Sequence, residues 1–266
     1  PLKAVVPTLV IVSAPQVDAH ELSRWVNGQL APAERSEVSV AEVDGKAYVI
    51  GDYNGATELL VYDIAANAWD KAASFPYAVH HAAAAAYEGR IYVFGGYVNG
   101  WQGTSALWMY DPKANKWQRK ADMPTPRAAA GAAVVAGKFH LVGGSGSNRQ
   151  NTSVHEVYEP RTDRWTSAAP IPTPGDHLVV AELDGLVVAV AGRVDGSPSR
   201  NLAVTEIYDP STNRWRRGAA LPTPRSGSAS AVLRKELYVM GGESGEKVFS
   251  EVESYQVEQD AWRTNP

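Results

Sequence analysis

Apolar residues return along this chain in short runs at a nearly constant interval. In each interval a run of small residues, such as residues 82–86 or 128–133, is followed by a continuous apolar run such as residues 91–94. A continuous apolar run that is bounded by glycine is typical of a strand buried on both faces. Alanine alone favours a helix, but residues 38–41 and 178–181 are rich in valine at the corresponding step and favour a strand. The pattern therefore predicts an all-β protein.

Aromatic residues mark the same interval. The spacings between six tryptophans are 44, 48, 48, 50 and 47 residues, and a tyrosine stands seven positions before each of the last five. The tryptophans are Trp25, Trp69, Trp117, Trp165, Trp215 and Trp262, and the tyrosines are Tyr62, Tyr110, Tyr158, Tyr208 and Tyr255. A period near fifty residues indicates stacked supersecondary units. Each unit contains four strand-length segments, of which the second ends at a glycine pair such as Gly95-Gly96.

The glycine pair, the tyrosine and the tryptophan at these offsets resemble the kelch repeat, and the resemblance covers about residues 25–262. It implies a kelch-type β-propeller of four-stranded blades. A WD40 propeller is disfavoured, because only Trp69 is followed by aspartate and the period is too long. We expect one strand of a last blade within residues 20–34, and then five complete blades at residues 35–79, 80–127, 128–175, 176–225 and 226–266.

The number of blades in the closed ring stays open at this point. The family resemblance implies six blades, and the chain ends four residues after Trp262, where three more strands would complete the sixth. We therefore expect a fragment that lacks about 40–50 residues, one repeat length. The alternative is a five-bladed ring with a spare N-terminal strand.

Residues 1–19 resemble the remains of a secretory signal peptide. Lys3 precedes the apolar run of residues 4–12, and small residues follow at 17–19, as at a cleavage site. An ordinary strand or an apolar linker is the alternative, and Pro7 inside the run favours it. The run is too short to span a bilayer. These features predict a secreted or periplasmic protein without a transmembrane span.

The composition limits the kinds of partner and of catalytic or metal site that this protein can have. The 266 residues carry a formal charge of −4 and no cysteine. A basic stripe is absent from the sequence, so we expect no nucleic-acid partner. The absence of cysteine excludes thiolate nucleophiles, iron–sulfur clusters and cysteine zinc sites. We expect a monomer with no cofactor and no metal site.

The differences in length between the repeats predict that one face of the ring carries the function. All the variation in repeat length lies in the loop between the second and third strands, which shares a mouth of the ring with the connections between blades. A rigid scaffold with variable loops on one face is typical of a binding surface. We therefore predict a ligand site at this mouth, rimmed by residues such as Tyr53, Tyr97, Trp101 and Arg149. The predicted ligand-binding residues are Arg35, Glu37, His81, Arg127, His177, Arg193 and Arg225.

The kelch resemblance implies that the arginines at these steps grip acidic peptide segments, because guanidinium groups pair bidentately with carboxylates. A carbohydrate is the other ligand considered. Alternatively, an arginine that follows Pro-Thr-Pro bonds only the loop carbonyls of its own blade. The sequence does not decide between these interpretations.

Enzymatic activity is the second hypothesis for the same mouth. Copper chemistry of the galactose-oxidase kind needs a cysteine cross-linked to tyrosine, which this sequence lacks. A carbohydrate-modifying enzyme that resembles the periplasmic kelch-type sialic-acid epimerase stays open, with Glu37, His81 and His177 as acid–base candidates. We expect the adjacent rings of His80 and His81 to point to opposite sides, as they do along a strand, and so to make a poor metal chelate. No catalytic motif is present, and we favour a non-enzymatic protein- or ligand-binding propeller.

Overall fold

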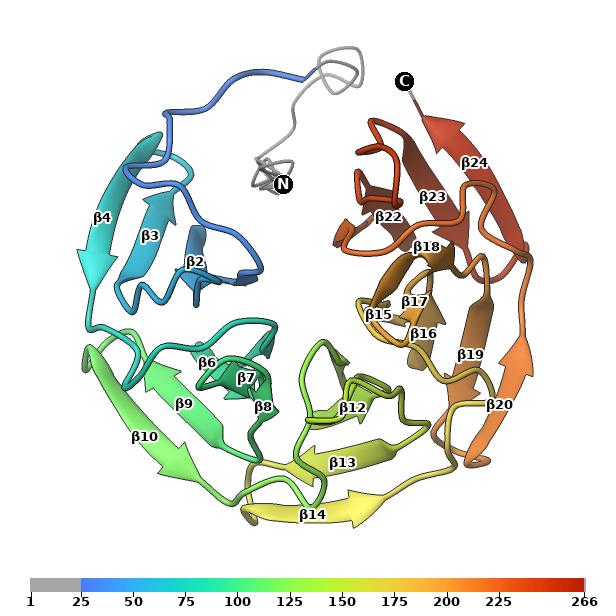
Figure 1. The fold of residues 1–266 in the computed structure, drawn as a ribbon, viewed down its shortest axis with the longest axis horizontal. Helices are drawn as coiled ribbons and strands as arrows, with labels where there is room; N and C mark the ends of the chain where they lie inside the picture. Colours follow the sequence, from blue (N-terminus) through green and yellow to red (C-terminus); the bar gives the residue numbers. More distant parts are fainter. Residues whose placement is uncertain (1–24, 266) are drawn as a thin grey trace.

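Five blades surround one axis in the computed structural model of the chain, which describes residues 25–265 (Figure 1). The described residues form strands and turns and no helix, which confirms the all-β prediction. The alanine-rich stretch near residue 83 is a strand, as the repeat predicted. Residues 1–19, with the proposed signal segment, lie outside the described part of the chain.

Each blade is a four-stranded antiparallel sheet whose strands follow chain order from the axis outward. The strands are β1 (Ser39–Val43), β2 (Lys46–Ile50), β3 (Leu59–Asp63) and β4 (Ala68–Ala72); β5 (Ala83–Tyr87), β6 (Arg90–Phe94), β9 (Leu107–Asp111) and β10 (Lys116–Lys120); β11 (Gly131–Val135), β12 (Lys138–Val142), β13 (His155–Glu159) and β14 (Arg164–Ser167); β15 (Val179–Leu183), β16 (Leu186–Val190), β19 (Thr205–Asp209) and β20 (Arg214–Arg217); and β21 (Ala229–Leu233), β22 (Glu236–Met240), β23 (Val252–Gln256) and β24 (Ala261–Asn265).

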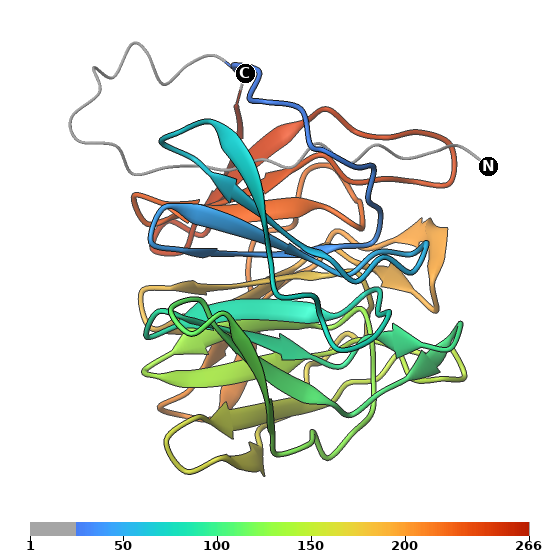
Figure 2. The same cartoon turned by 90° about the vertical axis from the view of Figure 1, so that its left-hand side faces the viewer.

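Two small ribbons occupy variable loops. The second blade carries β7 (Tyr97–Val98) with β8 (Gln102–Gly103), and the fourth carries β17 (Arg193–Val194) with β18 (Ser197–Asn201). Both ribbons stand out from the same side of the ring (Figure 2). The variable loops therefore build one face of the molecule.

Apolar side chains fill the space between neighbouring blades. Four buried clusters lie between consecutive blades, one at each of the four junctions from the first blade to the fifth. The innermost strands contact one another in the same order, and the crowding there favours small residues. A Cβ added at Gly131 of β11 would stand 2.2 Å from a methyl group of Val180 in β15, well inside van der Waals contact.

A polar clamp also fastens each blade to the segment before it, which is another blade in four of the five cases. In the second blade, Asn115 adopts a left-handed conformation with φ of 49°. Its Oδ1 accepts hydrogen bonds from the Tyr110 hydroxyl at 2.7 Å and from the Ala73 amide of the first blade at 2.8 Å. The Trp117 indole N–H donates to the Ala73 carbonyl at 2.8 Å. The corresponding clamp residues of the other blades are Asn67, Asp163, Asn213 and Asp260. The repeated tyrosine and tryptophan thus serve inter-blade cohesion, and an Asn or Asp five positions after the tyrosine completes the motif.

Replacing Asn115 with alanine should lower the free energy of unfolding by about 2–3 kcal/mol, because two hydrogen bonds are lost and alanine disfavours the left-handed conformation. Asn115→Asp is the matched control and should cost far less, since aspartate makes the same bonds in the third and fifth blades. Denaturant unfolding measures both. Equal losses in the two variants would contradict a role for the clamp.

The expected strand of a sixth blade is not formed among residues 25–34, which have no strand structure. Instead, the segment lies against the outer edge of the first blade. The Gln29 amide donates to Asn67, and the Gln29 carbonyl accepts from the Trp69 indole. A strand forms only where its backbone can pair with a neighbouring backbone. Here the backbone of Gln29 is bonded to side chains of the first blade instead. Figure 1 shows the ring open between the first and the fifth blades.

Residues 25–265 contain no helix that is long and apolar enough to cross a membrane.

Candidate functional site

One residue at the same position of the repeat precedes the first strand of every blade. It stands twelve positions after the repeated tryptophan and adopts a left-handed conformation, with φ between 51° and 62°. From the second blade on, the amide of this residue donates to the carbonyl of the corresponding residue one blade earlier, at 2.7–3.2 Å. The residues are Glu37, His81, Ala129, His177 and Gly227. A chain of backbone hydrogen bonds therefore runs from blade to blade at the mouth of the ring.

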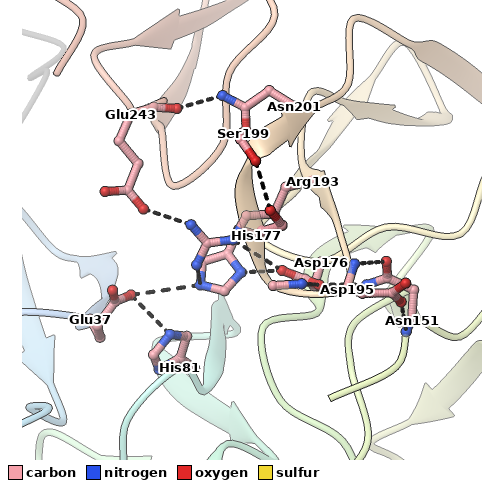
Figure 3. A network of polar contacts seen from close by, with 12 residues as sticks. Glu37, His81, Asn151, Asp176, His177, Arg193, Asp195, Ser199, Asn201 and Glu243 are labelled. Atoms are coloured by element: carbon pink, nitrogen blue, oxygen red, sulfur yellow. Dashed lines mark hydrogen bonds and ion pairs between the residues drawn. The ribbon is translucent and has the colours of Figure 1, made fainter. Parts of the chain in front are cut away.

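Among these residues, the side chains of Glu37, His81 and His177 converge (Figure 3). Glu37 Oε2 lies 3.2 Å from His81 Nε2 and 3.9 Å from His177 Nε2. The two imidazole rings are 4.8 Å apart and nearly perpendicular. Ala129 stands between them in the chain of bonds, and its small side chain leaves them room. The fold thus brings together three of the predicted site residues.

Asp176 orients His177 from behind. Its fully buried carboxylate accepts hydrogen bonds from His177 Nδ1 at 2.5 Å, from Asn151 Nδ2 at 2.5 Å and from the Gly196 amide at 2.8 Å. Burial by itself would raise the pKa of Asp176, but these hydrogen-bond donors, His177 first among them, hold that pKa below its usual value. Asp176 therefore stays ionised. The sequence analysis missed it, although an acid directly before a site histidine was a visible signal.

Arg193 closes the group from the fourth blade. Its guanidinium donates to Glu243 Oε1 at 2.6 Å, to Asp176 Oδ1 at 3.3 Å and to His177 Nε2 at 2.7 Å. Asn201 in β18 bonds the Glu243 carbonyl and holds the neighbouring loop in place. The guanidinium is thus neutralised within the protein. We refer to Glu37, His81, Asp176, His177, Arg193 and Glu243 as the axial cluster.

Burial keeps His81 neutral. It lowers the pKa of His81 to about 2, and the nearby positive charges of Arg193 and Arg149 act in the same direction. The expectation that the His80 and His81 rings point to opposite sides is wrong, because their Nδ1 atoms lie 2.6 Å apart. The left-handed conformation of His81 breaks the alternation of an extended strand.

Arg127 does not open onto the mouth, and that part of the predicted site is wrong. The residue is 1% exposed. Its guanidinium donates to Glu156 Oε2 at 2.5 Å and to the Leu141 carbonyl at 3.1 Å, both within the third blade. The alternative interpretation, bonding to loop carbonyls alone, is observed only in part, because Arg127 bonds the Thr125 carbonyl but also pairs with the Glu156 carboxylate.

Arg225 repeats this arrangement in the fifth blade, where it is 0% exposed and donates to Glu253 Oε2 at 2.5 Å. Both partner glutamates stand two positions before the repeated tyrosine, Tyr158 or Tyr255. That spacing was the sequence signal for a buried ion pair.

Arg35 also pairs locally. Its guanidinium lies 3.0 Å from Glu58 and 3.9 Å from the buried Asp52, and it does not join the axial cluster. Of the seven predicted residues, the structure gathers Glu37, His81, His177 and Arg193.

A pocket of about 670 Å³ adjoins the cluster between the first and second blades. Tyr53 and Trp101 line it and are 49% and 37% exposed, with ring centres 6.0 Å apart. His80 and Tyr97 lie beneath them, and the Arg149 guanidinium stacks 4.5 Å from the Trp101 ring. His80 belongs to this wall and touches His81, so the aromatic pocket and the axial cluster are continuous.

The fold and the repeated clamp define a kelch-type β-propeller. Residues 45–266 match the model of the Attractin/LZTR1 beta-propeller family, and the chain belongs to that family. Among solved structures, the chain is similar to the one titled "Structure of YjhT", with a TM-score of 0.79 and 16% identity, over 91% of this chain and 88% of that one. At this identity the likeness concerns the fold. No curated protein matches the chain significantly.

Proposed function

We propose that this propeller binds a carbohydrate in the aromatic pocket beside the axial cluster and does not transform it. The observation that carries the proposal is the exposed pair Tyr53 and Trp101 over a concave surface. Large exposed aromatic faces are uncommon on a protein without a ligand and mark binding sites. Sugar rings present C–H faces that stack on aromatic rings and hydroxyl groups that need polar partners.

The polar partners for such a ligand lie at the edges of the pocket. Asn54, Asn99 and Thr104 line it together with Arg119, and the charged cluster begins at His81 beyond His80. A few polar groups around an apolar floor are typical of small-molecule sites.

An acidic peptide is less well supported as the ligand. Arg127 and Arg225 are buried in ion pairs, and Arg193 is bonded to Glu243 and Asp176. These three guanidinium groups are already paired and would have to exchange partners to bind an external carboxylate. Secretion or periplasmic export and a monomeric state are part of the proposal. The apolar run after Lys3 supports export.

A carbohydrate-modifying enzyme is the second candidate, and the pair of Asp176 with His177 favours it. A histidine that a buried carboxylate orients, beside a second carboxylate in Glu37, has the geometry of a general base. Incubating a bound sugar with the protein and following its anomeric and epimeric signals by NMR separates the candidates. Unchanged exchange rates support binding alone, and accelerated exchange supports the enzyme.

Trp101→Ala should abolish most of the binding to any sugar that the full chain retains on a glycan array, with at least a tenfold rise in Kd by calorimetry. The lost stacking surface is the reason. Trp25→Ala is the matched control, because it removes a 58% exposed indole that does not line the pocket. The proposal fails if Trp101→Ala binds as tightly as the unmodified chain, or if the array retains acidic peptides and no sugar.

A further inference from the structure

Three atoms with metal-ligand character face one point at the axis. They are one carboxylate oxygen of Glu37 and one ring nitrogen each of His81 and His177, and all lie within 4.8 Å of one another. Ligand atoms 2.0–2.2 Å from a zinc ion stand about 3–3.5 Å apart. The separations of 3.2 and 3.9 Å from Glu37 to the two histidines approach that range. Side-chain movements of about 1 Å complete the geometry.

The hydrogen bonds place the lone pair of His177 at Nε2, the ring nitrogen that faces Glu37. Asp176 is a carboxylate and only accepts, so His177 Nδ1 carries the hydrogen of their 2.5 Å contact. In the neutral ring Nε2 then carries the lone pair. A carboxylate behind a histidine is the usual outer partner of a metal-bound imidazole, because it fixes the tautomer and raises the basicity of the ligand nitrogen.

The same reasoning applies to His81 through His80. The Gly100 carbonyl accepts from His80 Nε2 at 2.9 Å, so in the neutral ring His80 Nδ1 carries a lone pair. His80 Nδ1 therefore accepts from His81 Nδ1, and His81 Nε2 is left with its own lone pair. That lone pair faces Glu37 Oε2 at 3.2 Å with no hydrogen between them. A cation placed between the two atoms satisfies both.

The charge of the cluster fits a divalent ion. Glu37, Asp176 and Glu243 contribute three negative charges, and Arg193 contributes one positive charge, which leaves a net charge of −2. Arg193 also donates to His177 Nε2 at 2.7 Å and so occupies that lone pair. When His177 Nε2 binds a metal ion, Arg193 has to give up this hydrogen bond. Its bonds to Glu243 and Asp176 then hold the guanidinium in place.

We propose that Glu37, His81 and His177 bind a divalent transition-metal ion of the zinc type at the mouth of the axis. Two imidazoles and one carboxylate suit zinc and its neighbours. They leave a coordination position for water or for a hydroxyl group of a ligand. The site adjoins the aromatic pocket, but none of its three ligands lines that pocket, and its test does not depend on the proposed sugar binding.

The experiment titrates Zn²⁺ and Co²⁺ into the full chain without a histidine tag. We expect one Zn²⁺ per chain by calorimetry, a rise in Tm, and the intense visible absorption of four- or five-coordinate Co²⁺. Glu37→Gln keeps the shape of the ligand and should weaken Zn²⁺ binding at least tenfold. Asp176→Asn removes the outer partner of His177 and should weaken it about 10–100-fold.

Two controls locate the site. His155→Gln alters the other buried histidine pair, in which His140 Nδ1 lies 2.9 Å from His155 Nε2, and should leave one Zn²⁺ bound. Trp25→Ala, which removes an exposed indole that is not among the three ligands, should bind Zn²⁺ as the unmodified chain does. The proposal is overturned if the unmodified chain binds no Zn²⁺, if Glu37→Gln folds and binds it with unchanged affinity, or if Co²⁺ shows only the weak bands of the hydrated ion.

Discussion

Replacing Arg127 with alanine is expected to lower the free energy of unfolding by about 3–5 kcal/mol. The change leaves the carboxylate of Glu156 buried in the third blade without its 2.5 Å partner, and an uncompensated buried charge carries a penalty of this size. The same loss is expected for Arg225→Ala, which strands Glu253 in the fifth blade. Denaturant unfolding at neutral pH measures both.

A surface pair provides the comparison. Arg119 and Asp122 are about half exposed, and Arg119→Ala should change stability by less than about 1 kcal/mol. The double variant Arg127→Met, Glu156→Leu removes both charges and should recover much of the loss, because apolar side chains of similar volume can replace a buried pair. If Arg127→Ala were as stable as Arg119→Ala, the buried pair would have no structural role.

Acidification should destabilise the protein steeply below pH 6.5 through the pair of His140 and His155. Burial, with a smaller effect of the Lys138 charge, lowers the pKa of His140 to about 4. Burial and then the charge of His140 lower the pKa of His155 to about 3. The unfolded chain takes up protons near pH 6.5 and the native state does not, so stability is full above pH 6.5 and falls as the pH drops toward 4. Two such groups give a slope of up to about 2.7 kcal/mol per pH unit.

His140→Asn isolates this contribution. The side-chain amide can donate to His155 Nε2 in place of Nδ1 and does not titrate. The variant should lose about 1.4 kcal/mol per pH unit of the slope between pH 6 and pH 4.5. Unfolding curves at a series of pH values measure it, and an unchanged slope would show that the buried histidines are not its source.

The regular features of the fold follow from the sequence because they depend on local spacing. Strand length, the return of the aromatic residues and the family resemblance predicted the four-stranded blades correctly. The strand expected to carry Trp25 did not form among the described residues, because a strand also depends on an available neighbour. Sequence spacing contains no information about that neighbour.

The arginines show the same limit at the site. Arg127 and Arg193 looked equivalent as charged residues near one mouth. Arg127 is buried against Glu156 of the third blade, and Arg193 bridges Glu243, Asp176 and His177 across two blades. Which carboxylate a guanidinium meets depends on packing between segments that are 17–50 residues apart.

By itself, the sequence determined the blade, because its period and its apolar pattern act within about fifty residues. It also showed that Glu37, His81 and His177 occupy the same position in their repeats. The tertiary structure alone decided that these side chains meet, since the left-handed backbone at that position turns each of them toward a shared axis. Circular stacking then brings residues 140 positions apart, Glu37 and His177, to within 3.9 Å.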